Sequence, residues 1–78
     1  MKWQEHIELK PGVMCGKPVI KGTRITVELI LERLGDGCNV DDLIQSYPHI
    51  TPEHIRAAQA YAAASLATDD IVFLGESA

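Results

Sequence analysis

Residues 41–64 read DDLIQSYPHITPEHIRAAQAYAAA, a pattern of two apolar segments separated by a proline-containing corner. A short apolar segment ends at Tyr47-Pro48. Thr51-Pro52-Glu53 then forms a typical helix start, with a capping hydroxyl, proline at the first helical position and an acid. One helical face repeats apolar side chains at Ile55, Ala58, Ala62 and Leu66. We therefore expect a helix from about 52 to 67, preceded by a shorter helix and a tight corner, which together have the geometry of a helix-turn-helix.

Two further helix starts precede this corner. Thr26 and Asn39 are each followed by an apolar stripe, and their side chains can accept a hydrogen bond from a free helical N–H. Gly35 and Gly37 are expected to end the first helix, and Pro48 the second. The sequence therefore predicts a mainly α protein with a helix-turn-helix core over residues 26–67.

The segment before this core has the pattern of a small β arm. His6–Leu9 alternates between polar and apolar side chains, and Val19-Ile20 is flanked by Gly16 and Gly22. We expect short strands and tight turns over residues 5–25. Such an arm is barely stable alone in water, so it must pack on the helices or on a second chain.

The chain has 78 residues and is expected to be a single domain, 1–78, ending in a tail over residues 68–78. A domain of this size buries only roughly 60% of its unfolded surface, and self-association is one way to bury more. The tail contains a β-prone apolar run that favours docking on the core or pairing across a dimer. We expect a homodimer with these residues at its interface: Ile20, Ile71, Val72, Phe73 and Leu74.

Composition narrows the class of protein. Hydrophobic residues make up 46% of the chain and charged residues 23%, which is ordinary for a globular protein. No signal peptide or membrane-length apolar run is present, and Cys15 and Cys38 form no close pair. We therefore expect a cytoplasmic protein without a membrane contact, a metal or another cofactor. No nucleophile-and-base signature indicates an enzyme.

Charge is divided unevenly along the chain. The net charge is −4, with five basic and two acidic residues in 1–27 (net +3) and two basic and nine acidic residues in 28–78 (net −7). The N-terminal part is suited to phosphate or an acidic surface, and the remainder repels nucleic acid. Dispersed charge that only keeps the protein soluble is the alternative interpretation.

Two groups of residues are candidates for DNA contact. The start of the last helix offers side chains suited to a DNA groove, namely Thr51, His54, Arg56 and Gln59. The arm offers cations separated by turn residues, namely Lys17, Lys21 and Arg24, which suit a phosphate backbone or the acidic face of a partner. The alternative is structural: two packed helices with no nucleic-acid role, and an arm whose glycines and Arg24 only shape and brace the fold.

The chain also resembles a prokaryotic family known as domain of unknown function 433. The resemblance rests on residues 16–27, GKPVIKGTRITV, on Gly37, on Asp42-Leu43-Ile44, on residues 47–55, YPHITPEHI, and on Ala57-Ala58. It implies a homeodomain-like helix-turn-helix with an N-terminal β element. Members of the family are often regarded as antitoxins of type II toxin–antitoxin pairs, and a frequent partner is a small PIN-like nuclease.

The resemblance implies an antitoxin-like regulator that binds operator DNA and a PIN-like toxin as a dimer. It defines no catalytic residues. The competing hypothesis is a protein-interaction module that blocks a partner without touching DNA.

Overall fold

The computed structural model describes residues 1–67 and contains three helices and one small hairpin. The helices are α1 (Val27–Gly35), α2 (Val40–Ser46) and α3 (Pro52–Ala67), and the strands are β1 (Ile7–Leu9) and β2 (Pro18–Ile20). A short 3-10 helix precedes each strand: η1 (Trp3–Glu5) comes before β1, and η2 (Met14–Gly16) lies between β1 and β2. The mainly helical prediction is confirmed, together with the β-hairpin in the N-terminal arm. The predicted interface residues Ile71, Val72, Phe73 and Leu74 lie outside the described residues.

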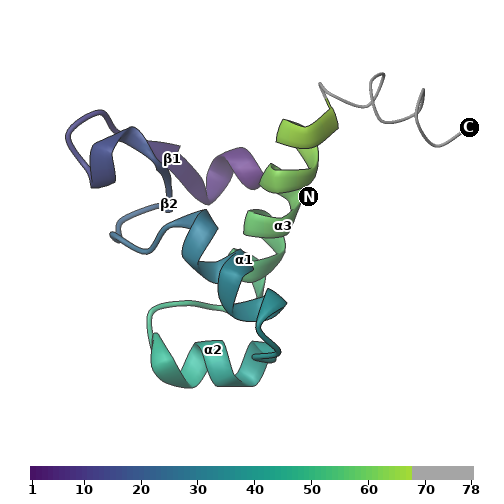
Figure 1. Cartoon of the computed structure of the whole chain (residues 1–78). Coiled ribbons are helices and arrows are strands. Elements are labelled where there is room, and N and C mark those ends of the chain that lie inside the picture. The colour runs from purple at the N-terminus through teal and green to yellow at the C-terminus, as the bar shows by residue number, and fades with distance from the viewer. Residues whose placement is uncertain (68–78) are drawn as a thin grey trace, which may run out of the picture.

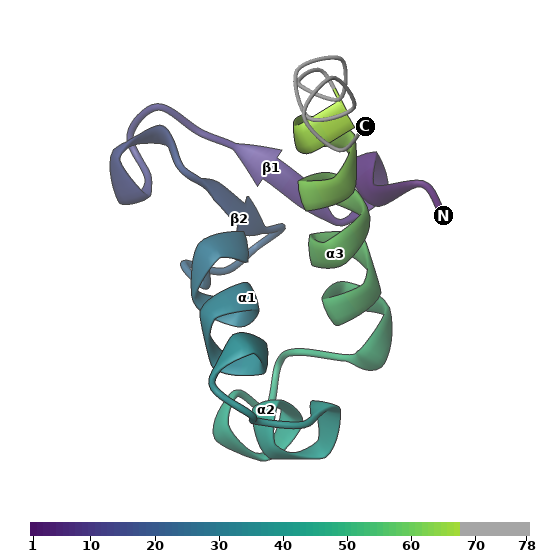
Figure 2. The same cartoon turned by 45° about the vertical axis from the view of Figure 1, so that its right-hand side comes forward.

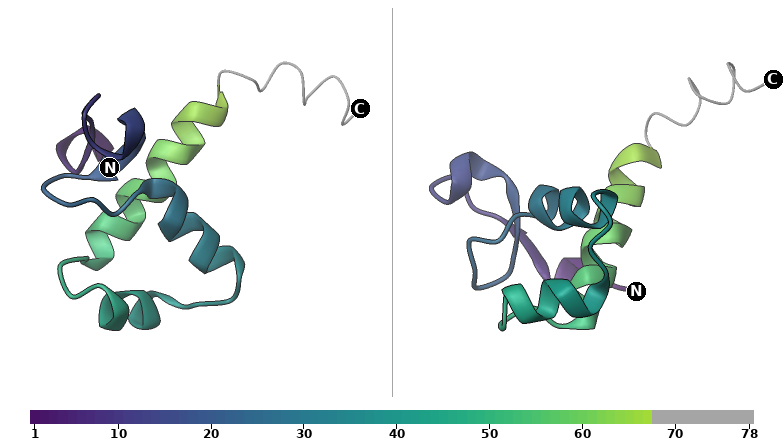
Figure 3. Two further views of the ribbon diagram at one scale, coloured as in Figure 1. Left: turned by 60° about the vertical axis from the view of Figure 1, so that its left-hand side comes forward. Right: turned by 60° about the horizontal axis from the view of Figure 1, so that its bottom comes forward.

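The three helices enclose the core, and the hairpin closes one end of it. α1 and α3 lie side by side, and α2 crosses the end of the pair that is farther from the hairpin (Figures 1 and 2). Figure 3 shows the three helices as the sides of a triangle. The hairpin reaches both helices, since β2 packs on α1 and β1 on α3. η1 also packs on α3, where the ring of Trp3 meets Tyr61 edge-on at a centroid distance of 4.9 Å.

Side-chain caps define where the helices begin, as predicted. The Thr26 hydroxyl accepts from the Leu29 N–H at 3.0 Å and starts α1. Asn39 and Asp42 form a reciprocal capping box at the start of α2. Each cap satisfies N–H groups that a helix cannot pair internally.

The loop between β2 and α1 is a tight turn held by several hydrogen bonds. The Thr23 N–H donates to the Ile20 carbonyl at 3.0 Å, and the Thr23 hydroxyl donates to the same carbonyl at 2.8 Å. Gly22 has a φ of 81°, a left-handed conformation that glycine adopts without steric cost and that the third position of a type II turn requires. The Ile20 N–H then donates to the Ile25 carbonyl at 2.9 Å. The loop is therefore fixed from both sides.

Ile20 lies in the centre of the core. In the hairpin it pairs with Ile7, and its side chain is fully buried, at 0% exposure, in the same cluster as Ile30 and Ile55. The sequence prediction places Ile20 at a dimer interface, whereas the structure buries it within one chain. Side chains that alternate along β2 would bury only one of the two neighbours Val19 and Ile20. Both are fully buried, because Val19 also pairs with Thr26 at the start of α1. Burial at 0% exposure within one chain leaves Ile20 no surface for a contact with a second copy.

We predict that Ile20→Ala lowers the free energy of unfolding by about 2–5 kcal/mol, because it removes buried methyl groups and leaves a cavity. Urea denaturation followed by circular dichroism measures this loss. Leu9→Ala is the matched control on the paired strand, since Leu9 is 55% exposed. A loss for Ile20→Ala no larger than that for Leu9→Ala would contradict the position of Ile20 in the core.

Candidate nucleic-acid interface

An open hollow lies between the β2–α1 loop and the start of α3. It has a volume of about 530 Å³, and four side chains with basic nitrogens line it, namely Lys21, Arg24, His49 and His54. The remaining lining residues, Gly22, Thr23 and Ile25, carry no acid. Within residues 1–67, neither Lys21 nor Arg24 forms an ion pair. We call these four side chains and the space between them the basic hollow.

The start of α3 is built so that an imidazole serves as part of the cap. The His54 N–H donates to the Thr51 hydroxyl at 3.3 Å, and the Thr51 N–H donates to Nδ1 of His54 at 3.1 Å. This is the reciprocal arrangement of a capping box, with histidine where glutamate or glutamine is usual. An accepting Nδ1 carries no proton, so the cap requires the neutral ring with its proton on Nε2.

The surroundings of His54 favour this neutral form. Partial burial lowers the pKa of His54, and the ring of His6, at a centroid distance of 5.6 Å, lowers it further. The Glu53 carboxylate and a hydrogen bond that the His54 ring donates to the His49 backbone oppose these two effects and raise the pKa of His54. Nε2 of His6 lies 3.9 Å from Glu53, at the outer edge of ion-pair distance. The capping imidazole therefore resists protonation more than a free histidine does.

Arg56 and Gln59 lie on the outer face of α3 and are not among the residues that line the basic hollow. Both are exposed, and their spacing of three residues places them on one face of the helix. Glu53 lies one turn earlier on the same face and reduces the positive charge there. Within the described chain Arg56 has no ion-pair partner, so its guanidinium is available to a ligand.

Lys17, the third cation predicted in the arm, lies apart from Lys21 and Arg24. Its Nζ donates to Glu28 Oε1 at 2.8 Å, and neither residue lines the basic hollow. This contact raises the pKa of Lys17 and lowers the pKa of Glu28, in both cases mainly through the hydrogen bond and then through charge attraction. The structure therefore brings Lys21, Arg24 and His54 together and leaves Lys17 out.

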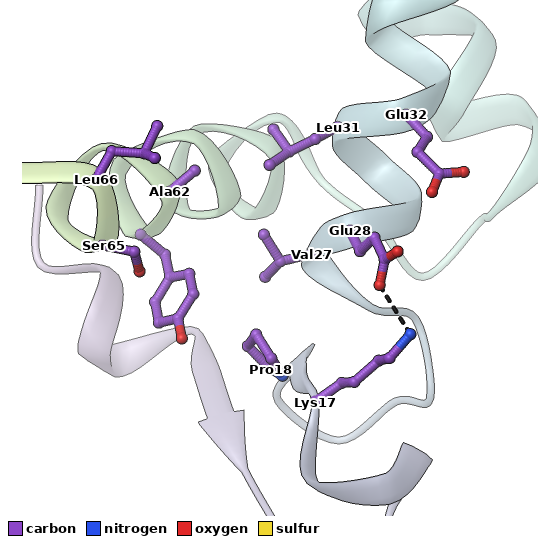
Figure 4. Close-up of a pocket in the computed structure, with 10 residues that line it drawn as sticks. Lys17, Pro18, Val27, Glu28, Leu31, Glu32, Ala62, Ser65 and Leu66 are labelled. Carbon is purple, nitrogen blue, oxygen red and sulfur yellow. Dashed lines mark hydrogen bonds and ion pairs between the residues drawn. The ribbon is translucent and has the colours of Figure 1, made fainter. Parts of the chain in front are cut away.

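Lys17 lines a second surface, between α1 and the end of α3, which we call the apolar groove. Figure 4 shows Val27 and Leu31 of α1 facing Ala62 and Leu66 of α3, with Pro18 at one end and the Lys17–Glu28 pair at the edge. Its volume is about 590 Å³. The sequence predicts Ala62 and Leu66 as core positions, but the end of α3 extends past the hairpin and leaves Leu66 59% exposed.

His49 and the apolar groove were not foreseen from the sequence as parts of a site. Among residues 1–67, no three histidine, cysteine or acidic side chains are grouped closely enough to hold a metal ion. In the same part of the chain, no helix has the length and the apolar character needed to cross a membrane. The only sequence signal for His49 is its position in the corner directly before the Thr51 cap.

The fold and the hollow together define a small three-helix protein with an N-terminal hairpin whose glycine-containing loop packs beside the last helix. Residues 7–62 match the family of proteins of unknown function called DUF433. The chain belongs to this family, and the resemblance seen in the sequence is confirmed.

Two relatives extend the comparison. The uncharacterized protein y4eO of Sinorhizobium fredii (strain NBRC 101917 / NGR234) is 31% identical over 62 residues, which are 80% of this chain and 28% of that protein. The crystal structure of a DUF433 member protein from Anabaena variabilis superposes with a TM-score of 0.77 at 31% identity. That superposition covers 86% of this chain and 66% of the other. The chain thus spans less than a third of the first relative and just under two thirds of the second.

We predict that stability falls as the pH drops below about 6.5, the pKa of an unperturbed histidine. The pKa of His54 is lowered in the folded chain, so the unfolded chain binds a proton more readily in this range. The contribution is complete above the unfolded pKa and is lost as the pH falls toward the folded pKa. Urea denaturation at a series of pH values between 5 and 8 measures this dependence.

The matched variant is His54→Gln, because glutamine at this position keeps a capping acceptor but does not titrate. Its free energy of unfolding should change less with pH than that of the parent chain. Equal slopes for His54→Gln and the parent chain would refute a titrating cap.

Proposed function

We propose that this protein is an antitoxin-like regulator that binds operator DNA as a dimer and also binds a PIN-like nuclease. The observation that carries the DNA-binding part is the convergence of Lys21, Arg24, His49 and His54 at the start of α3. The antitoxin part rests on the resemblance of the chain to its family.

In this proposal α2 and α3 act as a homeodomain-like helix-turn-helix. Five residues, 47–51, separate the two helices, and α2 packs against both α1 and α3. A recognition helix contacts base edges through residues near its N-terminus. Arg56 and Gln59 lie in the first two turns of α3 and are exposed, and their side chains match the donor and acceptor patterns of guanine and adenine respectively.

The β2–α1 loop would bind the phosphate backbone beside this helix. Lys21 and Arg24 project from a turn held by the Thr23 hydrogen bonds, so little loop ordering is needed when a ligand binds. A local cluster of cations can attract phosphate although the whole chain carries a net charge of −4.

A second candidate function is binding of a protein partner without DNA. It is favoured by the acidic remainder of the described chain, because residues 28–67 carry six acidic and two basic side chains. A mainly apolar protein interface depends little on salt, whereas DNA binding weakens steeply as salt rises. The salt dependence of binding therefore distinguishes the two functions.

We predict that Arg56→Ala weakens binding to the DNA upstream of the coding region by about 1–3 kcal/mol, the cost of losing one base contact. Lys21→Ala and Arg24→Ala should each lower the slope of log affinity against log salt by about 1, because each removes one phosphate contact. Fluorescence anisotropy at several salt concentrations measures both effects.

Lys17→Ala is the matched control, since it removes the same charge as Lys21→Ala but from a lysine held by Glu28 outside the basic hollow. It should leave the salt slope unchanged. Equal slopes for Lys17→Ala and Lys21→Ala would show that the hollow has no special role, and an affinity independent of salt would favour the protein-binding function.

A further inference from the structure

The apolar groove lies at the C-terminal end of the described chain. Val27 and Leu31 form one wall and Ala62 and Leu66 the other, and Leu66 remains 59% exposed beside these neighbours (Figure 4). Contiguous apolar surface that is left open in water favours a segment that covers it. Among the polar residues in its lining, Lys17 and Glu28 bind each other at the edge of the groove.

The sequence contains a segment that matches this surface in chemistry and in length. Residues 71–74, Ile-Val-Phe-Leu, follow α3 and lie outside the described residues. Four extended residues measure about 13 Å. Residues 61–66 rise about 7.5 Å along α3, so one such segment is long enough to cover the groove. We propose that the groove binds residues 71–74 of a second copy of this chain, and that two copies exchange these segments.

The link between α3 and the apolar run favours a second copy over the chain's own segment. The groove extends back along α3 from Leu66 to Tyr61, so the chain's own segment would have to reverse direction within residues 68–70. Helices commonly reverse through a left-handed residue, usually glycine, directly after the last turn. Residues 68–70 are Thr-Asp-Asp, and the first glycine after α3 is Gly75, beyond the apolar run. A segment from a second copy needs no such reversal.

The short link also determines how the two copies meet. Three residues span at most about 10 Å, so the end of α3 in one copy must lie close to the groove of the other. Ala63, Ala64 and Ala67 are exposed at this end of α3, and small side chains allow two helix axes to approach closely. A two-fold contact between the ends of α3 fills both grooves at once. The inference deepens the proposed function, because it names the surface through which the proposed dimer forms.

Disulfide trapping in the full chain tests the exchange directly. Ala62→Cys in the groove and Phe73→Cys in the segment are combined with Cys15→Ser and Cys38→Ser, which remove the native thiols. After mild oxidation, a covalent dimer should be the main species on a non-reducing gel. A control with Ser77→Cys in place of Phe73→Cys should remain mainly monomeric. An intrachain disulfide in the double-cysteine chain, or free thiols, would overturn the proposal.

Sedimentation velocity gives a second measurement without new thiols. Phe73→Asp should raise the dimer dissociation constant at least about tenfold, because it brings a charge into an apolar groove. Ser77→Asp adds the same charge three residues beyond the apolar run and should leave the constant within about twofold of the parent value. A Phe73→Asp chain that dimerises like the parent chain would overturn the proposal.

The two proposals fail separately. Trapping without salt-dependent DNA binding would leave the exchanged dimer in place and reject the operator-binding function. Salt-dependent DNA binding without trapping would keep that function and reject the exchange.

Discussion

Two hydrogen bonds from Thr23 to the Ile20 carbonyl hold the turn that connects the hairpin to the helices. Backbone N–H and side-chain hydroxyl of Thr23 both donate to one carbonyl, at 3.0 and 2.8 Å, so the turn is closed twice. Closure directs Ile20 into the core and lets Val19 pair with Thr26. Thr26 then caps α1. One turn thus joins the hairpin to the first helix and determines where Lys21 and Arg24 project.

The same constraint explains how an acidic chain acquires a basic surface. Lys21 and Arg24 are far from α3 in sequence, and only the hairpin packing on α1 and α3 brings them beside His49 and His54. The cap of α3 uses the imidazole of His54 as an acceptor, so a titratable ring is both a structural element and part of the hollow. Stability and the charge of the hollow are therefore coupled through one side chain.

Local signals account for the elements that were predicted from the sequence. Each of the capping side chains Thr26, Asn39 and Thr51 accepts a hydrogen bond from the N–H three residues later, so these caps can be predicted from the local sequence. The end of α1 before Gly37, which adopts a φ of 101°, can be predicted in the same way. The burial of Ile20 and the separation of Lys17 from Lys21 depend on tertiary packing. Lys17 and Lys21 are four residues apart in the sequence. Their spacing does not reveal that Glu28 of α1 pairs with Lys17 and not with Lys21. His49 joins the hollow for the same reason, since a corner residue acquires its neighbours only when the hairpin packs beside α3.

α3 differs along its length, and this difference separates the two surfaces of the molecule. Its first two turns carry Glu53, Arg56 and Gln59 on the outer face, whereas its last turns carry mainly alanine and Leu66. Alanine stabilises the helix where the hairpin and α2 no longer support it, and it presents little side chain to a neighbour. The N-terminal half of α3, which carries the charged side chains, is suited to a polar ligand. The C-terminal half, which is apolar, is suited to a contact that excludes water. His54 in the basic hollow and Tyr61 in the apolar groove are about two helical turns apart on α3, so a second chain bound in the groove would leave the hollow open.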